Sequence, residues 1–256
     1  MRLCRLSKPP DVSAEATQAL QPTLERAPLR INVAAVLLDI EGTLSPISFV
    51  QDVLFPYAKA KLRDYLSANA SDPAVRDILA QARDLSGAPD AIAAIEAWQA
   101  NDVKAPPLKK LQGMIWDSGY RSGAFVSPIF PDALAAFRRW HVDGFPLYIY
   151  SSGSVQAQHL FFEFTEEGNL RSLFEDYFDT EIGPKTDLAS YQRIADQIGR
   201  RPQEIVFMSD NVKELEAARD AGLATVHVLK DRTPSTPDFR EISDYSEITL
   251  GLNPAS

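Results

Sequence analysis

The chain has 256 residues, of which 45% are hydrophobic and 24% are charged, values that are typical of a folded protein rather than a disordered one. Its 26 basic and 35 acidic residues give a formal net charge of −9, so a nucleic acid is not expected as the main partner. No apolar run approaches the ~20 residues of a membrane-spanning helix, and the single cysteine, Cys4, excludes an intramolecular disulfide and suits a cytoplasmic location.

Residues 1–30 contain scattered arginine and proline residues and no long apolar run, so we do not expect a secretory signal there. Their composition and terminal position favour a disordered N-terminal extension. A short surface helix from Ala14 to Leu20 is the alternative interpretation.

The apolar run 33–38 predicts a buried strand, and Asp39-Ile40-Glu41-Gly42-Thr43 follows it directly. The glycine permits a tight turn. Carboxylates that are taken out of water must be paired or must coordinate a metal. The tip of this strand is therefore a candidate catalytic edge.

Residues 51–127 have a different character from the strand before them. Apolar residues recur there at helical spacing in four successive stretches, which are separated by Pro73, by 87–89 and by 106–107. This pattern predicts a small helical bundle inserted after the first strand.

From Pro131 onward, amphipathic helices alternate with short apolar runs at 145–150, 204–208 and 224–229. Such alternation predicts an α/β fold with a doubly wound parallel sheet covered on both faces. We therefore predict a core made of residues 31–50 and 128–256, with residues 51–127 as an inserted helical cap domain.

Polar side chains lie at the ends of three of the predicted strands, namely Asp39 with Glu41, Ser151 with Ser152, and Ser209 with Asp210. Ligands of open α/β sheets bind beyond the carboxyl ends of the strands, so these groups are expected to converge on one crevice. Lys185 precedes an amphipathic helix and would place a cation beside the same edge.

The residue types in this set suit phosphoryl transfer. Asp39 and Asp210 offer the oxygen ligands that Mg²⁺ prefers, and Ser151 and Lys185 can hold an anion. Glu41 is a second carboxylate that can exchange a proton. A nucleophilic carboxylate, a proton donor and Mg²⁺ together permit a reaction through an aspartyl-phosphate.

Each segment also has a structural interpretation when it is taken alone. The Asp-x-Glu-Gly-Thr and Ser-Ser-Gly segments could be plain turns, the lysine could be solvent-exposed, and Ser209-Asp210-Asn211 is a good helix N-cap. The occurrence of all four at predicted element ends, in this order, favours a functional site.

This order of motifs resembles that of the haloacid dehalogenase superfamily. The strings 36–43, 46–50, 52–58, 148–158 and 178–180 more closely resemble the enolase-phosphatase E1 family of methionine salvage, and the resemblance extends from about residue 34 to 229. Glu41 occupies a position at which most of the superfamily has aspartate. The enolase-phosphatase E1 branch has glutamate there, as this sequence does.

The resemblance implies a haloacid dehalogenase-like core with a cap, and a Mg²⁺-dependent monomer that acts on 2,3-diketo-5-methylthiopentyl-1-phosphate. Such an enzyme enolises the diketone and then removes the phosphate to give the acireductone 1,2-dihydroxy-3-keto-5-methylthiopentene. The implied roles are nucleophile and metal ligand for Asp39, acid–base group and metal ligand for Glu41, substrate binding for Ser151 and Ser152, phosphate binding for Lys185, metal binding for Asp210 and an outer acid for Glu214.

Two other functions remain open at this point. A generic phosphatase of the same superfamily would act on another small phosphate ester, and a non-catalytic phosphate-binding module would need only Asp39 and a metal site. Within the cap, Tyr57 and Trp116 are candidates for contact with a methylthio tail, although aromatic residues at helical spacing more often belong to a core.

Overall fold

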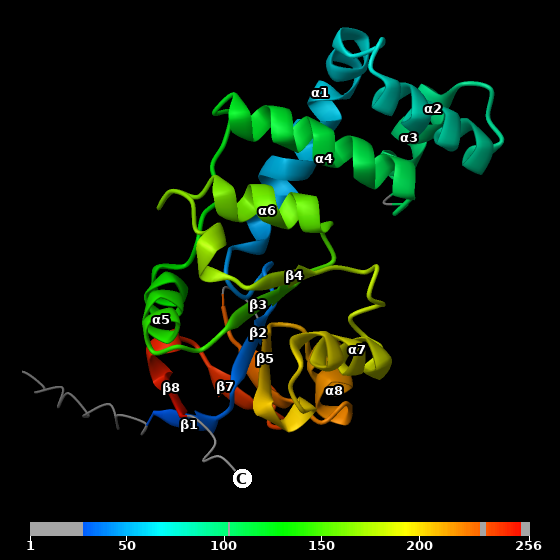
Figure 1. Ribbon diagram of the computed structural model, residues 1–256. Helices are drawn as coiled ribbons and strands as arrows, with labels where there is room; N and C mark the ends of the chain where they lie inside the picture. The colour runs from blue at the N-terminus through cyan, green and yellow to red at the C-terminus, as the bar shows by residue number, and fades with distance from the viewer. Residues whose placement is uncertain (1–27, 102, 231–233, 252–256) are drawn as a thin grey trace, which may run out of the picture.

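The computed structural model describes residues 28–101, 103–230 and 234–251. Most of the extension predicted for residues 1–30 lies outside this part of the chain. The first described strand, β1 (Leu29–Asn32), already begins within the predicted extension. It pairs in parallel with β8 (Ile248–Gly251) in a two-stranded sheet (Figure 1).

The main sheet has six strands, all parallel, and it confirms the predicted α/β class. Strand β2 occupies the centre, between β3 and β5, so the acidic strand tip has a neighbouring strand end on each side. In spatial order the strands are β4 (Asp176–Phe178), β3 (Leu147–Tyr150), β2 (Ala35–Leu38), β5 (Ile205–Ser209), β6 (Ala224–Val228) and β7 (Arg240–Ile242).

Helices cover both faces of this sheet, which explains why its central strands are continuously apolar. Alternate residues of β2 enter two hydrophobic clusters, with Val36 and Leu38 in one and Ala35 and Leu37 in the other. Helices α5 (Pro131–Val142) and α6 (Val155–Glu163) contribute to the first cluster, and α7 (Leu188–Ile198) and α8 (Val212–Asp220) to the second.

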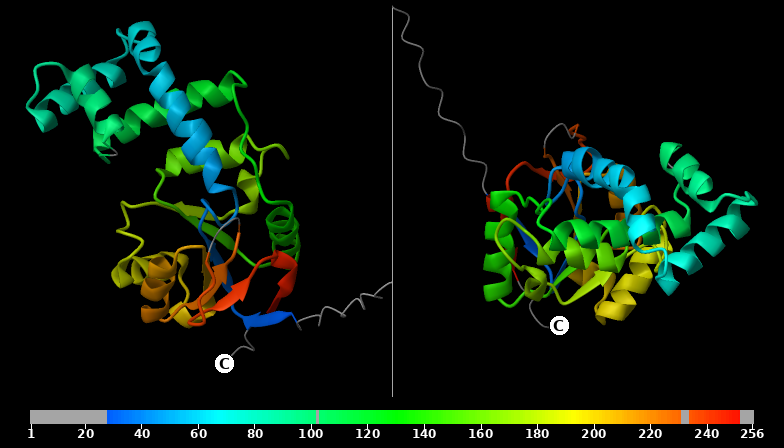
Figure 2. Two further views of the ribbon diagram at one scale, coloured as in Figure 1. Left: turned by 180° about the vertical axis from the view of Figure 1, so that it is seen from behind. Right: turned by 90° about the horizontal axis from the view of Figure 1, so that it is seen from above.

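The chain leaves β2 through a short π-helix (Phe49–Leu54) and then forms four helices beyond the strand ends (Figures 1 and 2). Asp72 and Asp90 cap the second and third of these helices by accepting hydrogen bonds from main-chain N–H groups. The helices are α1 (Phe55–Ala68), α2 (Pro73–Ser86), α3 (Ala91–Ala100) and α4 (Pro106–Arg121).

These four helices bury a hydrophobic cluster of their own, which includes Leu62, Ile78, Ile95 and Leu111. Helix α4 also lies against α6 of the sheet-bearing part (Figure 1). None of the helices in the described ranges is long and apolar enough to cross a membrane.

The buried cluster of helices α1 to α4 predicts that substitutions inside and outside it change the free energy of unfolding by different amounts. Leu111 is 0% exposed and Leu85 is 59% exposed, so Leu111→Ala should reduce the free energy of unfolding by about 2–5 kcal/mol, whereas Leu85→Ala should change it by less than about 0.5 kcal/mol. Urea unfolding followed by tryptophan fluorescence measures both. Equal effects of the two substitutions would contradict the assigned packing.

Candidate active site

The turn after β2 positions two carboxylates. Asp39 is 3% exposed, and its main-chain N–H donates to the carbonyl of Met208 in β5 over 3.1 Å. Gly42 has φ of +74°, and a Cβ at that position would lie 2.2 Å from Oδ2 of Asp210. Thr43 Oγ1 accepts a hydrogen bond from the Asp210 main-chain N–H over 3.0 Å. Only glycine therefore lets the turn approach Asp210 so closely.

Lys185 provides the cation in direct contact with these acids. Its ammonium forms buried ion pairs with Asp39 and, over 2.6 Å, with Glu214. It also lies 5.6 Å from the ring centre of Tyr150 and 5.9 Å from that of Phe207. Burial lowers the pKa of Lys185, but the two carboxylates outweigh burial and the pKa is raised, so the side chain stays charged.

Glu214 and Ser209 complete the support of Asp39. Ser209 Oγ lies 3.2 Å from both Asp39 Oδ2 and Glu214 Oε2. Burial, and then the charge of Asp39, raise the pKa of Glu214 to about 7. Asn211, the N-cap of α8, donates a side-chain hydrogen bond to Glu214 over 3.3 Å. The cap sequence predicted for this segment thus also fixes the acid one turn later.

Asp210 is half-buried, and no residue in the described part of the chain hydrogen-bonds its carboxylate. Burial, and then the charge of Asp39, raise its pKa to about 7. Two close carboxylates with one of them unpaired are a suitable setting for a hard cation. Within the described ranges no three His, Cys, Asp or Glu side chains form a metal-binding group, so a cation here would need main-chain, water or substrate oxygens as further ligands.

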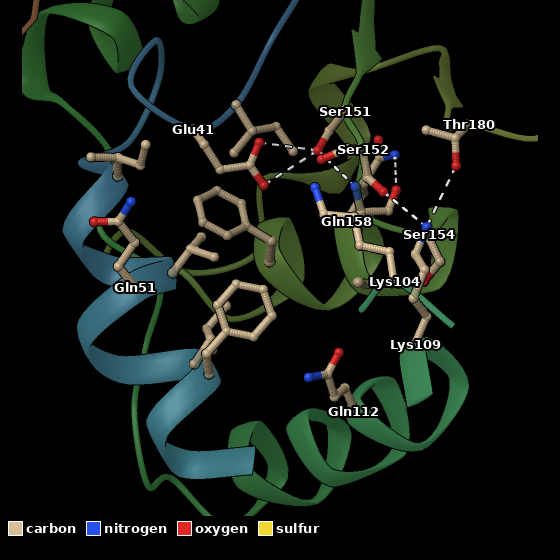
Figure 3. Close-up of a pocket in the computed structure, with 18 of the residues that line it drawn as sticks. Glu41, Gln51, Lys104, Lys109, Gln112, Ser151, Ser152, Ser154, Gln158 and Thr180 are labelled. Carbon is tan, nitrogen blue, oxygen red and sulfur yellow. Dashed lines mark hydrogen bonds between the residues drawn. The ribbon is translucent and has the colours of Figure 1, made fainter. Parts of the chain in front are cut away.

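Glu41 points its carboxylate at the end of β3 rather than into solvent. Ser151 Oγ lies 3.1 and 3.3 Å from the two oxygens of Glu41 and accepts a hydrogen bond from the Gly153 N–H over 3.1 Å (Figure 3). Burial and the neighbouring charge of Asp39 raise the pKa of Glu41. A raised pKa favours the protonated form, which can act as a general acid.

The six residues singled out from the sequence line a single cavity of about 1260 Å³. Residues of helices α1 to α4 form the facing wall, among them Lys109 and Gln112 (Figure 3). Trp116 also lines this wall. Of the two aromatic candidates for tail binding, Trp116 lines the cavity, whereas Tyr57 packs against Phe125 with ring centres 4.9 Å apart. The cavity residues from the sequence are Asp39, Glu41, Ser151, Ser152, Lys185 and Asp210.

Several residues with a role in this geometry were not predicted from the sequence. Thr43 and Ser209 belong to the motifs named from the sequence, which assigned no supporting role to their hydroxyl groups. Lys109 and Gln112 have no local signal, because a polar residue on an amphipathic helix normally faces solvent.

The chain matches the family model described as haloacid dehalogenase-like hydrolase over residues 33–222. It is 55% identical to "Enolase-phosphatase E1" of Bradyrhizobium sp. over 222 residues, which cover 87% of this chain and 96% of the relative. It is 42% identical to "Enolase-phosphatase E1" of Aquifex aeolicus, with 85% of this chain and 100% of the relative covered.

Solved structures agree with these sequence matches. The UTR4 protein of Saccharomyces cerevisiae aligns with a TM-score of 0.72 and 35% identity, covering 85% of this chain and 100% of that one. CbbY of Rhodobacter sphaeroides aligns with a TM-score of 0.59 at 16% identity, over 85% of this chain and 97% of that one, and so supports the fold alone. The chain belongs to the haloacid dehalogenase-like hydrolases and, among them, to the enolase-phosphatase E1 family.

Proposed function

We propose that this protein converts 2,3-diketo-5-methylthiopentyl-1-phosphate to the acireductone 1,2-dihydroxy-3-keto-5-methylthiopentene in methionine salvage, by enolisation followed by dephosphorylation. The observation that carries the proposal is the pairing of two acids with different environments in one cavity. Asp39 is held by the ammonium of Lys185, whereas Glu41 contacts Ser151 and has a raised pKa. Different environments suit different roles, namely a nucleophile and an acid–base group.

In the phosphatase step, an Asp39 oxygen attacks phosphorus as the bond from phosphorus to the C1 oxygen breaks. Glu41 donates its proton to the departing oxygen, which leaves as the hydroxyl of the acireductone. Water then attacks the aspartyl-phosphate while Glu41 accepts a proton, which restores both acids and releases phosphate. Lys185 and the Ser151–Ser152 loop would hold the phosphate oxygens during both displacements.

In the enolase step, a proton leaves C1 and a proton is delivered to the oxygen on C2. Glu41 lies in the same cavity as the phosphate-binding groups, and a carboxylate with a raised pKa is suited to removing and returning a proton. We therefore assign this transfer to Glu41, with Ser151 fixing the orientation of its carboxylate.

We propose Mg²⁺ as the metal, held by the carboxylates of Asp39 and Asp210 and by the main-chain carbonyl of Glu41. The Glu41 carboxylate is engaged by Ser151, which leaves its main chain for the metal. The donor set is made of oxygen atoms only, as Mg²⁺ prefers. When bound, Mg²⁺ offsets the negative charge of the carboxylates and of the substrate phosphate.

We further propose that residues 31–50 and 128–256 act as the catalytic core and residues 51–127 as a cap that excludes water. The separate hydrophobic cluster of α1 to α4 supports this division. We expect the enzyme to work as a cytoplasmic monomer on a small molecule, without a nucleic-acid or membrane partner. A non-catalytic phosphate-binding module is not supported, because the family is one of hydrolases.

Asp39→Asn removes the nucleophile and should reduce phosphate release at least about 1000-fold. ³¹P NMR of the diketone phosphate measures this loss. The matched control is Asp196→Asn on the exposed face of α7, which should release phosphate at the wild-type rate. An Asp39→Asn variant that turned over normally would rule out covalent catalysis.

Glu41→Gln keeps a side chain that can contact Ser151 but cannot exchange a proton. We expect enol formation and breakdown of the phospho-enzyme each to slow by about 10²–10⁴-fold. Rapid-quench measurements with ultraviolet detection of the enol separate the two steps. Slow phosphate release with wild-type enolisation would show that another residue removes the C1 proton.

Removal of divalent metal with a chelator should abolish phosphate release, and added Mg²⁺ should restore it. Asp210→Asn removes one of the two carboxylates, so the Mg²⁺ concentration for half-maximal activity should rise by about tenfold or more. A titration with MgCl₂ gives this value for both proteins. Full activity of the chelated wild-type protein would contradict the metal site.

A further inference from the structure

The wall of the cavity that faces the catalytic acids contains one polar side chain with unusual surroundings. Gln112 lies on α4, is 7% exposed and lines the cavity. Its amide points away from the helix toward the space below Glu41 and Ser151 (Figure 3). No other residue in the described part of the chain hydrogen-bonds this amide.

The oxygen and nitrogen of this amide open onto the cavity and are not sealed in the protein interior, so its donor and acceptor stay available to a bound ligand. Gln158, on the opposite wall, is held through its nitrogen, while its Oε1 is buried without a hydrogen-bond partner in the described part of the chain. Its Nε2 donates to the carbonyls of Gly153 and Phe178, each over 2.9 Å. Gln158 therefore supports the main chain, whereas Gln112 offers its hydrogen-bonding groups to the cavity.

Contacts on either side hold Gln112 in this place. Lys109, one turn earlier in α4, donates to the carbonyl of Ser152 over 3.1 Å and to Thr180 Oγ1 over 3.4 Å (Figure 3). Trp116, one turn later, donates from Nε1 to the carbonyl of Leu54 over 2.8 Å. These contacts fix the part of α4 that carries Gln112, so the position of its backbone relative to the cavity is set before any ligand arrives.

Building on the proposed function, we infer that Gln112 is a specificity-determining residue that hydrogen-bonds the dicarbonyl part of the substrate. The oxygen on C2 is an acceptor in the diketone and becomes a donor in the enol. A primary amide has both an N–H donor and a C=O acceptor, so Gln112 can bind this oxygen before and after enolisation. A phosphate ester with a hydrocarbon chain would leave the amide unpaired and is therefore discriminated against.

The test compares Gln112→Leu with the wild-type protein on two compounds. The first is the diketone phosphate, for which kcat/KM is measured by ³¹P NMR. The second is pentyl phosphate, which lacks the two ketone oxygens and is measured through its inhibition constant. We expect kcat/KM for the diketone phosphate to fall about 10–100-fold and the inhibition constant of pentyl phosphate to change less than about threefold.

Two further variants keep the result interpretable. Gln81→Leu is the matched control, because Gln81 is half-buried on α2 and does not line the cavity. It should change neither kcat/KM for the diketone phosphate nor the inhibition constant of pentyl phosphate. Gln112→Asn retains the amide but retracts it by one methylene, so it should also lower kcat/KM for the diketone phosphate, and it serves if the leucine variant does not fold.

An equal effect of Gln112→Leu on both compounds, or no effect on the diketone phosphate, would overturn the assignment of Gln112 and leave the proposed function intact. A wild-type protein that does not convert the diketone phosphate would overturn both.

Discussion

The ammonium of Lys185 lies between the carboxylates of Asp39 and Glu214, and all three side chains are buried. Removal of one partner from such a cluster costs about 3–5 kcal/mol, because it leaves an uncompensated charge in the interior. The partners come from the end of β2, the turn before α7 and the first turn of α8. The parallel sheet brings these distant segments together, so the cluster and the topology depend on each other.

Negative charge nevertheless remains in excess at this edge of the sheet. Burial and the charge of Asp39 raise the pKa values of Glu41 and Asp210, the latter to about 7. A divalent cation would relieve this excess, and the cation in turn would attract a phosphate ester. The helical wall across the cavity contributes the opposite character, with a half-buried Trp116 and the amide of Gln112. The charged groups at the edge of the sheet therefore serve catalysis, and the side chains of the helical wall serve recognition of the substrate.

The central strands and the six cavity residues could be predicted from sequence because both depend on local patterns. Strands β2, β3 and β5 are continuous apolar runs, and each ends in a polar segment. Strands β4 and β7 were missed, since edge strands of three residues carry no periodic signal. Gln112 could not be found either, because its surroundings are formed by segments far from it along the chain.

The most direct measurement is a time course of the wild-type protein on the diketone phosphate, with ³¹P NMR and ultraviolet absorbance recorded together in the presence of Mg²⁺. Enolase and phosphatase chemistry in one cavity predicts that a second phosphate-ester resonance rises and falls before inorganic phosphate reaches its final level, and that enol absorbance appears with that ester and persists in the acireductone. Release of inorganic phosphate without an enol at any stage would contradict the account and leave a simple phosphatase.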